Sequence, residues 1–415
     1  MPGVADAAAR RAHVRWRDRI QPAFGVAFGS FVVIGVTDAV LGVAWPAIRR
    51  SLGLPIGDLG LIQVAGTLGF LVSSALSGRV SAWRGRARAM AAAGTLGAGA
   101  LVAFAGAPRI AVLLAAALVI GTAGGQIEPG MQTHVALHAR DRAMNFLHGC
   151  YGIGATVGPI LVSSLLLLHA SWRLAYLALA GAEAVVVVVG VLRRRRVFEA
   201  ETPVAALDVH PHRSPQATTD AGLARPVLLT SLALFFVYVG VEVGTGQWAF
   251  TVLTSARHLG AGTAGALVSG YWAALTGVRF LAAALGHRVD PEVVLSVSAG
   301  AALVGECLMW WNPLPAIGDV GLLLTGGALA PAFPLMMART PRWASARLSS
   351  VIGWQSAASS LGIAVLSGLA ALLVQRLGLA VLGPYLIALA AAFLALQLLA
   401  LRFEHFAATR RPPHR

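Results

Sequence analysis

Long apolar stretches separated by short polar connections run along almost the whole chain. Residues 110–120, 178–192 and 381–401 are predominantly apolar, and each forms all or part of the roughly 20 residues that a helix needs to cross a bilayer. The recurrence of this pattern predicts an all-α membrane protein with twelve transmembrane helices. We expect these helices near residues 22–46, 57–77, 88–107, 110–134, 143–168, 172–192, 226–254, 261–285, 292–311, 316–338, 346–373 and 379–402.

The composition agrees with a bilayer as the solvent for most of the surface. Of the 415 residues, 57% are hydrophobic and 12% are charged, and the mean hydropathy is +0.74. The net charge of +15 does not indicate nucleic acid, because the basic residues lie in short connections and not in a separate basic domain. Cys150 and Cys307 both lie inside apolar stretches, so we interpret them as packing residues and expect neither a disulfide nor a metal site.

The arginines indicate how the helices are oriented. All 32 basic residues are arginine, a bias typical of high-GC bacterial genomes. If the N-terminus is cytoplasmic, the outer connections hold Arg49, Arg50, Arg109, Arg173, Arg257 and Arg376, while Arg279 lies inside a helix. The other 25 arginines then face the cytoplasm, so the positive-inside rule predicts cytoplasmic termini in a bacterial inner membrane. Residues 1–21 have no signal cleavage site after a short apolar core, and we expect them to be a retained cytoplasmic end.

The chain repeats itself at an offset near 204 residues. Corresponding residues are Asp38 and Glu242, Gly66 and Gly270, Gly149 and Gly353, and Gly158 and Gly362, while residues 124–129 match 326–331 at an offset of 202. Because each half has an even number of helices, the repeat is parallel. We therefore predict an N-terminal half at 1–192, a cytoplasmic linker at 193–225 and a C-terminal half at 226–415, which can rock about a site at their interface.

The loop after the second helix adds a more specific signal. Residues 78–88 read Gly-Arg-Val-Ser-Ala-Trp-Arg-Gly-Arg-Ala-Arg. Together with the six-plus-six topology and the central linker, this loop resembles the major facilitator superfamily. Ala82 departs from the family pattern, which usually has an acid there. The resemblance implies the major facilitator fold, in which two pseudo-symmetric six-helix bundles enclose a central site.

Three helices also resemble the fucose permease group of sugar–proton symporters within this superfamily. The matching features are Asp38, Gly-Gly-Gln-Ile-Glu at 124–128 followed by Gln132, and Leu-His-Gly at 147–149. The resemblance implies that Asp38 and Glu128 are the two acids of the group and that Gln132 is the amide four residues later. Asn is more usual at the amide position, and Pro129 is a further departure.

Three acidic residues fall in helices expected to line the central site: Asp38, Glu128 and Glu242. An ionised carboxylate at mid-membrane costs at least a few kcal/mol, so it must be paired, neutral or in contact with water. A carboxyl group of this kind can bind a proton on one side of the membrane and release it on the other. The alternative is a structural hydrogen bond, which Thr245 or Gln247 could supply to Glu242.

Four further ionisable residues within helices have less specific interpretations. Glu183 and Glu306 fall in the sixth and ninth helices, which are peripheral in the resembled fold. Arg279 could bind a carboxylate or an anionic substrate, or its guanidinium could snorkel to the cytoplasmic surface. His148 lies near the cytoplasmic mouth of the fifth helix, where it could contact substrate or serve as a hydrogen-bonded packing residue.

Recognition of a sugar needs flat aromatic faces beside amide or carboxylate groups, because a sugar has apolar C–H faces and polar edges. The second half of the chain offers this mixture. The candidate substrate-binding residues there are Gln247, Trp248, Tyr271, Trp272, Trp354 and Gln355, each of which could alternatively be a packing residue.

No enzyme motif is present: the chain has no phosphate-binding loop, no zinc-spaced Cys or His cluster and no nucleophile elbow. We expect no catalytic residue, cofactor or metal, so transport must draw on a gradient. The leading hypothesis is proton-coupled symport of a small polar solute, such as a sugar or polyol, by a monomer in the bilayer. The alternatives are a proton-driven exporter of drugs or metabolites and a non-transporting membrane sensor or structural subunit.

Overall fold

The structure is a computed structural model that describes residues 3–138, 141–193, 221–285, 290–312, 314–340, 343 and 348–409. These residues are helical apart from short connections, and none of them forms a β-strand. The helices are α1 (Gly3–Leu52), α2 (Asp58–Arg84), α3 (Arg86–Ala105), α4 (Ile110–His138), α5 (Asp141–Leu167), α6 (Arg173–Leu192), α8 (Ala221–Thr251), η2 (Val252–Ala256), α9 (Ala261–Leu285), α10 (Pro291–Trp311), α11 (Pro315–Leu329), α12 (Ala332–Arg339), α14 (Leu348–Leu377), η4 (Leu379–Val381) and α15 (Leu382–Thr409).

Eleven spans in the described part of the chain are long and apolar enough to cross a membrane, with α11 and α12 forming one of them. The remaining long helix, α9, has a comparable length, packs against α5 and α11 and contains Arg279. The predicted all-α membrane fold is therefore confirmed, and α9 lies where the eighth of the twelve predicted helices was expected. One difference lies in α1, which begins at Gly3 and so includes residues that we expected to be only a cytoplasmic end. This segment is rich in alanine and arginine, both of which favour helix.

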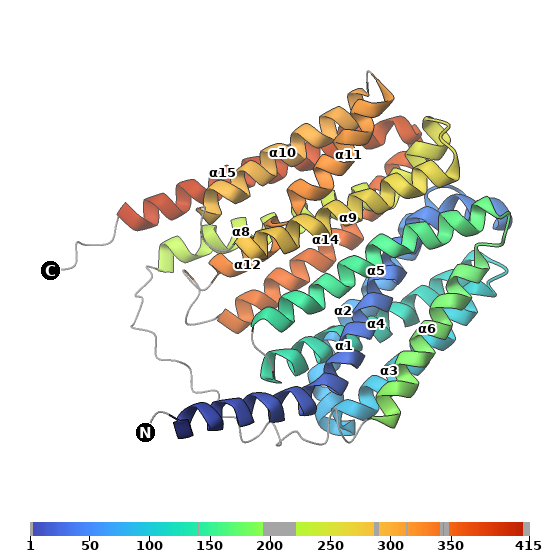
Figure 1. Ribbon diagram of the computed structural model, residues 1–415. Coiled ribbons are helices and arrows are strands. Elements are labelled where there is room, and N and C mark those ends of the chain that lie inside the picture. Colours follow the sequence, from blue (N-terminus) through green and yellow to red (C-terminus); the bar gives the residue numbers. More distant parts are fainter. Residues whose placement is uncertain are drawn as a thin grey trace.

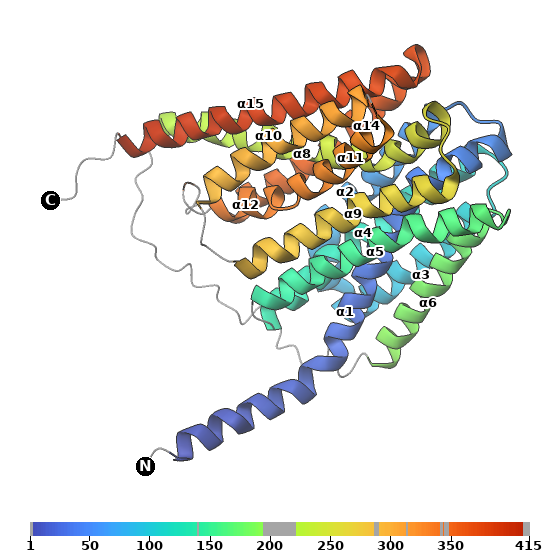
Figure 2. The ribbon, with the colours of Figure 1, turned by 45° about the horizontal axis from the view of Figure 1, so that its top comes forward.

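Helices α1–α6 and α8–α15 form two groups that lie side by side, with both chain ends at the same end of the molecule (Figures 1 and 2). The same pairs of helices pack in each group. In the first group α1 packs on α5, α2 on α4, and α3 on α6; in the second α8 packs on α14, α9 on α11, and α10 on α15. This is the packing expected of two pseudo-symmetric bundles. Most of the predicted linker at 193–225 lies outside the described residues, and α8 begins at Ala221.

Glycines bring α1 and α5 unusually close together. A Cβ atom at Gly35 would collide with the backbone carbonyl of Tyr151, and one at Gly154 would collide with the carbonyl of Val32. Since a backbone carbonyl cannot turn aside as a flexible side chain can, only glycine fits at these two positions. The close approach fixes α1 and α5 relative to each other beside Asp38.

The two halves touch at the end of the molecule opposite the chain termini. The backbone N–H of Gly57, just before α2, donates to Oε1 of Gln375 in α14 at 3.0 Å. One turn further along the same pair of helices, Gly60 lies against Ala371. Helix α1 packs on α8 beyond Asp38. We call this region the closed end and the other the terminal end. Helices α5 and α9 contact each other toward both ends, since Gly265 lies against Ser163 and Gly149 lies against Phe280.

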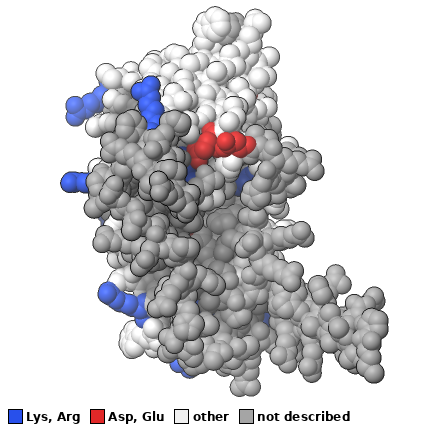
Figure 3. All heavy atoms as spheres, turned by 90° about the vertical axis from the view of Figure 1, so that its left-hand side faces the viewer, with Lys and Arg blue, Asp and Glu red and all other residues white. Residues whose placement is uncertain are grey.

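Arginines at the closed end bind the carboxyl ends of helices. Arg173 donates to the carbonyls of Ala105 and Ala107, at the end of α3, and Arg257 donates to the carbonyl of Met309 in α10. Burial lowers the pKa of the Arg257 guanidinium, and the nearby Asp319 carboxylate opposes this effect. Figure 3 views the terminal end, where described arginines are spread over both halves and acidic side chains gather at one place.

Candidate functional site

Asp38 lies near the middle of α1 with its side chain exposed, although the residues on either side of it in the helix are largely buried. The Oη atom of Tyr151 in α5 donates a hydrogen bond to its Oδ2 at 3.1 Å. The glycine contacts between α1 and α5 hold the two side chains in register. Asp38 therefore faces the accessible region between the two halves and keeps one protein hydrogen bond there.

Glu128 lies in α4 and is partly exposed. Gln132, one helical turn later, donates through Nε2 to Oε1 of Glu128 at 3.1 Å. The carboxyl of Glu128 is close enough to Asp38 for the two charges to interact. Pro129, the next residue, lacks the N–H that would complete the helix beside Glu128. Two acids and an amide from the first half thus lie in one region.

Glu242 in α8 has a cationic partner, unlike the other two acids. Arg279 in α9 lies 3.6 Å from it, and the two side chains are 23% and 15% exposed for arginine and glutamate respectively. The phenol of Tyr238, one turn before Glu242 in α8, lies close to its carboxylate. The Oη atom of Tyr271 donates to the backbone carbonyl of Glu242 at 2.8 Å. Burial and these contacts hold the ion pair between α8 and α9.

A break in the tenth span gives Arg279 a second role. The span was predicted as one helix, but it divides into α11 and α12 at Ala330 and Pro331. Pro334 has no N–H to bond the carbonyl of Ala330 four residues earlier, and Arg279 Nε donates to this carbonyl at 3.2 Å. Tyr238 Oη similarly donates to the carbonyl of Leu329 at 3.2 Å. Groups of the ion-pair cluster therefore bond two carbonyls at the break, one of which, that of Ala330, is released by Pro334.

Tyr151 links the acids of both halves. Its phenol lies within electrostatic range of Asp38, Glu128 and Glu242. Sequence reasoning did not select Tyr151 or Tyr238. A usable signal existed for both, because Tyr151 follows His148 by three residues on one helix face and Tyr238 precedes Glu242 by four.

Three predicted substrate residues lie beside this region with polar atoms that are not all satisfied. Gln247 Nε2 donates to the Asp38 backbone carbonyl at 2.9 Å, so it connects α8 with α1. Its Oε1 atom is buried and has no hydrogen-bond partner in the described part of the chain, and the same is true of Nε1 of Trp272. Tyr271 and Trp272 pack edge to face with ring centroids 5.1 Å apart, and both are buried in the apolar core.

The other predicted residues have different surroundings. His148 packs edge to face against Phe31 at 5.8 Å and lies within electrostatic range of Arg279. Trp248 is 2% exposed, in the apolar core. Gln355 is fully buried and its Nε2 donates to Ser231 and Thr340 within the second half. The side-chain amide of Gln355 is therefore hydrogen-bonded to other residues of the second half.

Trp354 lies on the outer face of α14. It is 46% exposed and shares its helix face with Leu361, Val365 and Leu372, which are exposed along the whole length of the helix. That stripe is the side of α14 that no other described helix covers. The structure does not bring Trp354 together with the acids.

The two peripheral acids are buried. Glu306 is 2% exposed and accepts a hydrogen bond from Thr245 Oγ1 at 2.5 Å. Glu183 is 7% exposed and lines a separate pocket in the first half. Among the described residues, no group of three or more His, Cys, Asp or Glu side chains is placed to hold a metal ion.

Comparisons with known proteins identify the fold. The family model described as the Major Facilitator Superfamily matches residues 26–315. No curated protein sequence matches the chain. Among solved structures, a mutant of the nucleoside transporter NupG has a TM-score of 0.73 and 14% identity, covering 92% of this chain and 99% of its own.

Two other similar structures are transporters as well. The xylose transporter XylE from E. coli, in an inward open conformation, has a TM-score of 0.71 and 14% identity, with 92% of this chain and 95% of its own covered. The human organic anion transporter MFSD10 has a TM-score of 0.65 and 16% identity, with 92% and 99% covered. At these identities the likeness shows the fold alone.

Proposed function

Since the chain belongs to the major facilitator superfamily and is therefore a membrane transporter of small molecules, we propose that it couples the movement of a small polar solute to that of protons. The observation that carries the proposal is the pair of carboxyls at Asp38 and Glu128. Each has a neutral hydrogen-bond donor, Tyr151 or Gln132, and neither has an ion-pair partner in the described part of the chain.

Such a pair suits reversible protonation. Like charges repel, so the two interacting carboxyls are most stable when one of them binds a proton. The exposure of Asp38 gives protons from water a route to the pair. Glu242, in contrast, pairs with Arg279 and keeps its charge compensated without a proton. We assign proton coupling to Asp38 and Glu128, with Glu242 as part of the structural frame.

The solute is a sugar or polyol in this proposal. The amides of Gln132 and Gln247 and the indole N–H of Trp272 are the donors and acceptors that we propose for hydroxyl groups. The sequence features resembling fucose permeases point to the same class. Two of the similar structures carry xylose and nucleoside transport in their names, and both solutes are rich in hydroxyls.

The two halves give access to this site in turn. We propose that the protein lies in a bacterial inner membrane with its terminal end facing the cytoplasm. The reason is that 25 of the 32 arginines fall on the side of the chain termini in the predicted topology. The structure then corresponds to a cytoplasm-facing state, because the inter-half contacts of α2 and α14 lie at the closed end. Rocking of the halves would open that end and close the terminal end.

Uptake into proteoliposomes tests the proposal. Purified protein is reconstituted and challenged with an inward pH gradient and a labelled panel of pentoses, hexoses, polyols, nucleosides and lipophilic cations. We expect accumulation of a hydroxyl-rich solute that collapses when an ionophore removes the gradient. Transport of lipophilic cations alone, against the direction of proton flow, would establish the exporter alternative. Accumulation that ignores the pH gradient would rule out proton coupling.

A further inference from the structure

The side chain of Gln247 lies where α8 of the second half meets α1 of the first, and it is 6% exposed. Its Nε2 atom donates to the backbone carbonyl of Asp38 at 2.9 Å. A Cβ atom at Gly42 would lie 2.5 Å from the backbone carbonyl oxygen of Gln247. Asp38 and Gly42 are about one turn apart in α1. Gln247 therefore belongs to the contact that keeps the closed end shut.

The amide of Gln247 is only half satisfied in this contact. Its Nε2 atom has a partner, but its Oε1 atom is closed to water and no described residue donates a hydrogen bond to it. The other half of the protein helps to cover this atom, because a Cβ atom at Gly42 would lie 2.8 Å from it. Closing the halves therefore removes water from Oε1 and gives it no hydrogen bond in return.

The balance of these two effects decides what Gln247 does. The bond to Asp38 replaces a bond that the amide makes with water, so its net contribution is small. An acceptor that is buried without a partner loses its hydration outright, and this loss is generally larger than the net gain from one hydrogen bond. Gln247 therefore destabilises the shut contact, although one of its hydrogen bonds joins the two halves.

The neighbouring contact between α2 and α14 also buries polar atoms without partners. Nε2 of Gln63 in α2 and Oγ of Ser367 in α14 have no hydrogen-bond partner in the part of the chain that the structure describes. The residues that follow them face each other across the halves, since a Cβ atom at Gly368 would be 3.5 Å from Cγ2 of Val64. Unpartnered polar atoms are thus found along both of these inter-half contacts.

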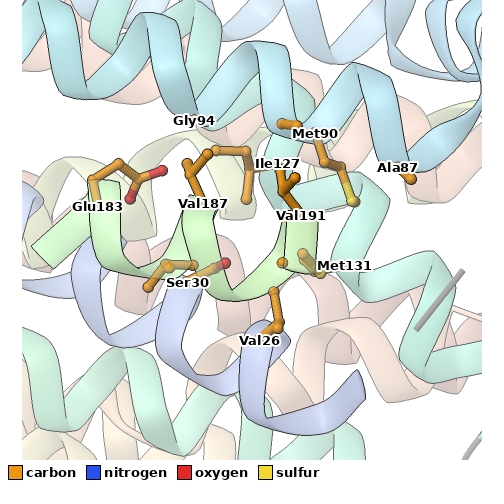
Figure 4. A pocket seen from close by; sticks show the side chains of 13 residues that line it. Val26, Ser30, Ala87, Met90, Gly94, Ile127, Met131, Glu183, Val187 and Val191 are labelled. Carbon is orange, nitrogen blue, oxygen red and sulfur yellow. The ribbon is translucent and has the colours of Figure 1, made fainter. Parts of the chain in front are cut away.

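A buried polar group inside one half has a different effect. Glu183 is 7% exposed, and Figure 4 shows it with Ser30 and Val187 among helices of the first half. These helices, α1, α3, α4 and α6, move together when the halves rock, so the burial of Glu183 is the same in both states. Glu183 therefore affects the stability of the fold, whereas Gln247 affects the balance between the states.

We propose that Gln247 favours opening of the closed end, so that the cytoplasm-facing state is poised to return to the opposite state. Water that enters between α1 and α8 binds Oε1 and replaces the bond between Nε2 and the Asp38 carbonyl. This role rests on the rocking of the halves in the proposed function, but it requires neither the proposed solute nor proton coupling.

Distances between spin labels on the two halves measure the populations of the two states. In the full chain with both native cysteines replaced, labels are attached to cysteines at Leu168 and Leu377. These positions are 77% and 64% exposed, at the closed end of the first and second half respectively. The protein is measured in nanodiscs without solute, so that a role of Gln247 in solute binding does not enter. We expect two distance populations, of which the shorter is the shut state.

Gln247→Met keeps the length of the side chain and removes both polar atoms, so the ratio of shut to open protein should rise about tenfold. Gln375→Met is the matched control. Gln375 also joins the halves, but its Oε1 atom is the one that accepts a bond, from the N–H of Gly57, so the ratio should fall or stay level. Ser367→Ala, a milder change, should raise the ratio, whereas Ser30→Ala inside the first half should leave it unchanged.

A fall in the ratio in Gln247→Met would overturn the proposal, because the bond to Asp38 would then outweigh the buried Oε1. An unchanged ratio in Gln247→Met, or in Ser367→Ala if Gln247→Met does not fold, would also overturn it. Gly42→Ala shows that the labels detect opening, because the added Cβ collides with the Gln247 carbonyl in the shut state. A single population in every variant, Gly42→Ala included, would instead contradict the rocking of the halves, and with it the proposed function.

Discussion

At the residue scale, the central site contains three carboxyls with two kinds of partner. Asp38 and Glu128 accept hydrogen bonds from neutral groups, whereas Glu242 lies 3.6 Å from a guanidinium. An uncompensated carboxyl gains from binding a proton, and a compensated one does not. The partners of each acid, and not its depth in the membrane, are therefore our reason for proposing Asp38 and Glu128 as the coupling residues.

Glu128→Gln should abolish accumulation and preserve exchange. A neutral amide mimics the protonated carboxyl, so the protein can still move solute between the two sides but cannot use a proton gradient. In proteoliposomes, the ratio of inside to outside solute should fall to about 1 under a pH gradient, with counterflow retained. Glu306→Gln, a buried acid outside the central cluster, is the matched control. Wild-type accumulation in Glu128→Gln would remove Glu128 as the coupling residue.

Arg279→Gln should destabilise the fold through Glu242. Removing the guanidinium leaves a largely buried carboxylate without its cation, for which we expect a loss of about 3 kcal/mol. Glu242→Gln with Arg279→Gln should cost less than the two single changes added together, because neither charge is then left alone. Unfolding of all four proteins in detergent measures the cycle. Single effects that add within about 0.5 kcal/mol would contradict a coupled pair.

The sequence identified the acids but not all their partners. Asp38, Glu128 and Glu242 stand out because charges are rare in apolar helices. Tyr151 does not stand out, because a tyrosine in such a helix is unremarkable until packing brings it to Asp38. Trp354 shows the reverse case: its type suited a substrate site, but the helix face on which it lies is fixed by how α14 packs on α8 and α2.

At the element scale, close contact between glycines and backbone fixes the site. Hydropathy alone predicted the helices and their approximate ends, since the length of a span is set by the bilayer. Hydropathy could not predict the break between α11 and α12. Whether a membrane helix breaks at the prolines at 331 and 334 depends on which groups of other helices bond the freed carbonyls, and hydropathy does not report those groups. Arg279 takes the Ala330 carbonyl that Pro334 frees, and Tyr238 bonds the neighbouring Leu329 carbonyl; both come from other helices.

Gly35→Ala should destabilise the first half. The added Cβ collides with the Tyr151 carbonyl, so α1 and α5 must separate, at an expected cost of about 1–3 kcal/mol. Gly99→Ala in α3 is the control, because a Cβ there meets nothing within 4 Å and alanine favours helix by up to about 1 kcal/mol. Thermal unfolding should move down for the first variant and stay level or rise for the second. Equal midpoints would show that the α1–α5 contact is not tight.

At the scale of the whole molecule, the repeat relates the packing of one half to that of the other. It was visible in the sequence, and the paired helices now follow it. The contacts between the halves do not follow from the repeat, because they depend on the state of the transport cycle. Charge pattern is the only sequence signal for which end faces the cytoplasm.

Labelling tests that orientation. In a protein whose two native cysteines are replaced, a single cysteine at Ala206, in the predicted linker, should react with an impermeant thiol reagent only after cells are opened. A cysteine at His169, between α5 and α6 at the closed end, should react in intact cells. The reverse pattern would invert the proposed topology.

A cross-link across the closed end should trap one state of the cycle. Val64 of α2 and Gly368 of α14 lie on opposite halves, and a Cβ atom at Gly368 would be 3.5 Å from Cγ2 of Val64. Cysteines at both positions can therefore approach the separation of roughly 3.5–4.5 Å between Cβ atoms that a disulfide needs.

With the two native cysteines replaced, oxidation of Val64→Cys with Gly368→Cys should stop transport. Solute binding from the terminal end should persist, because Asp38 stays exposed there. Reduction should restore transport, and Val64→Cys alone should be insensitive to oxidant. If the oxidised double variant still transports, the contact between α2 and α14 does not have to open, and rocking about the central site is excluded as the mechanism.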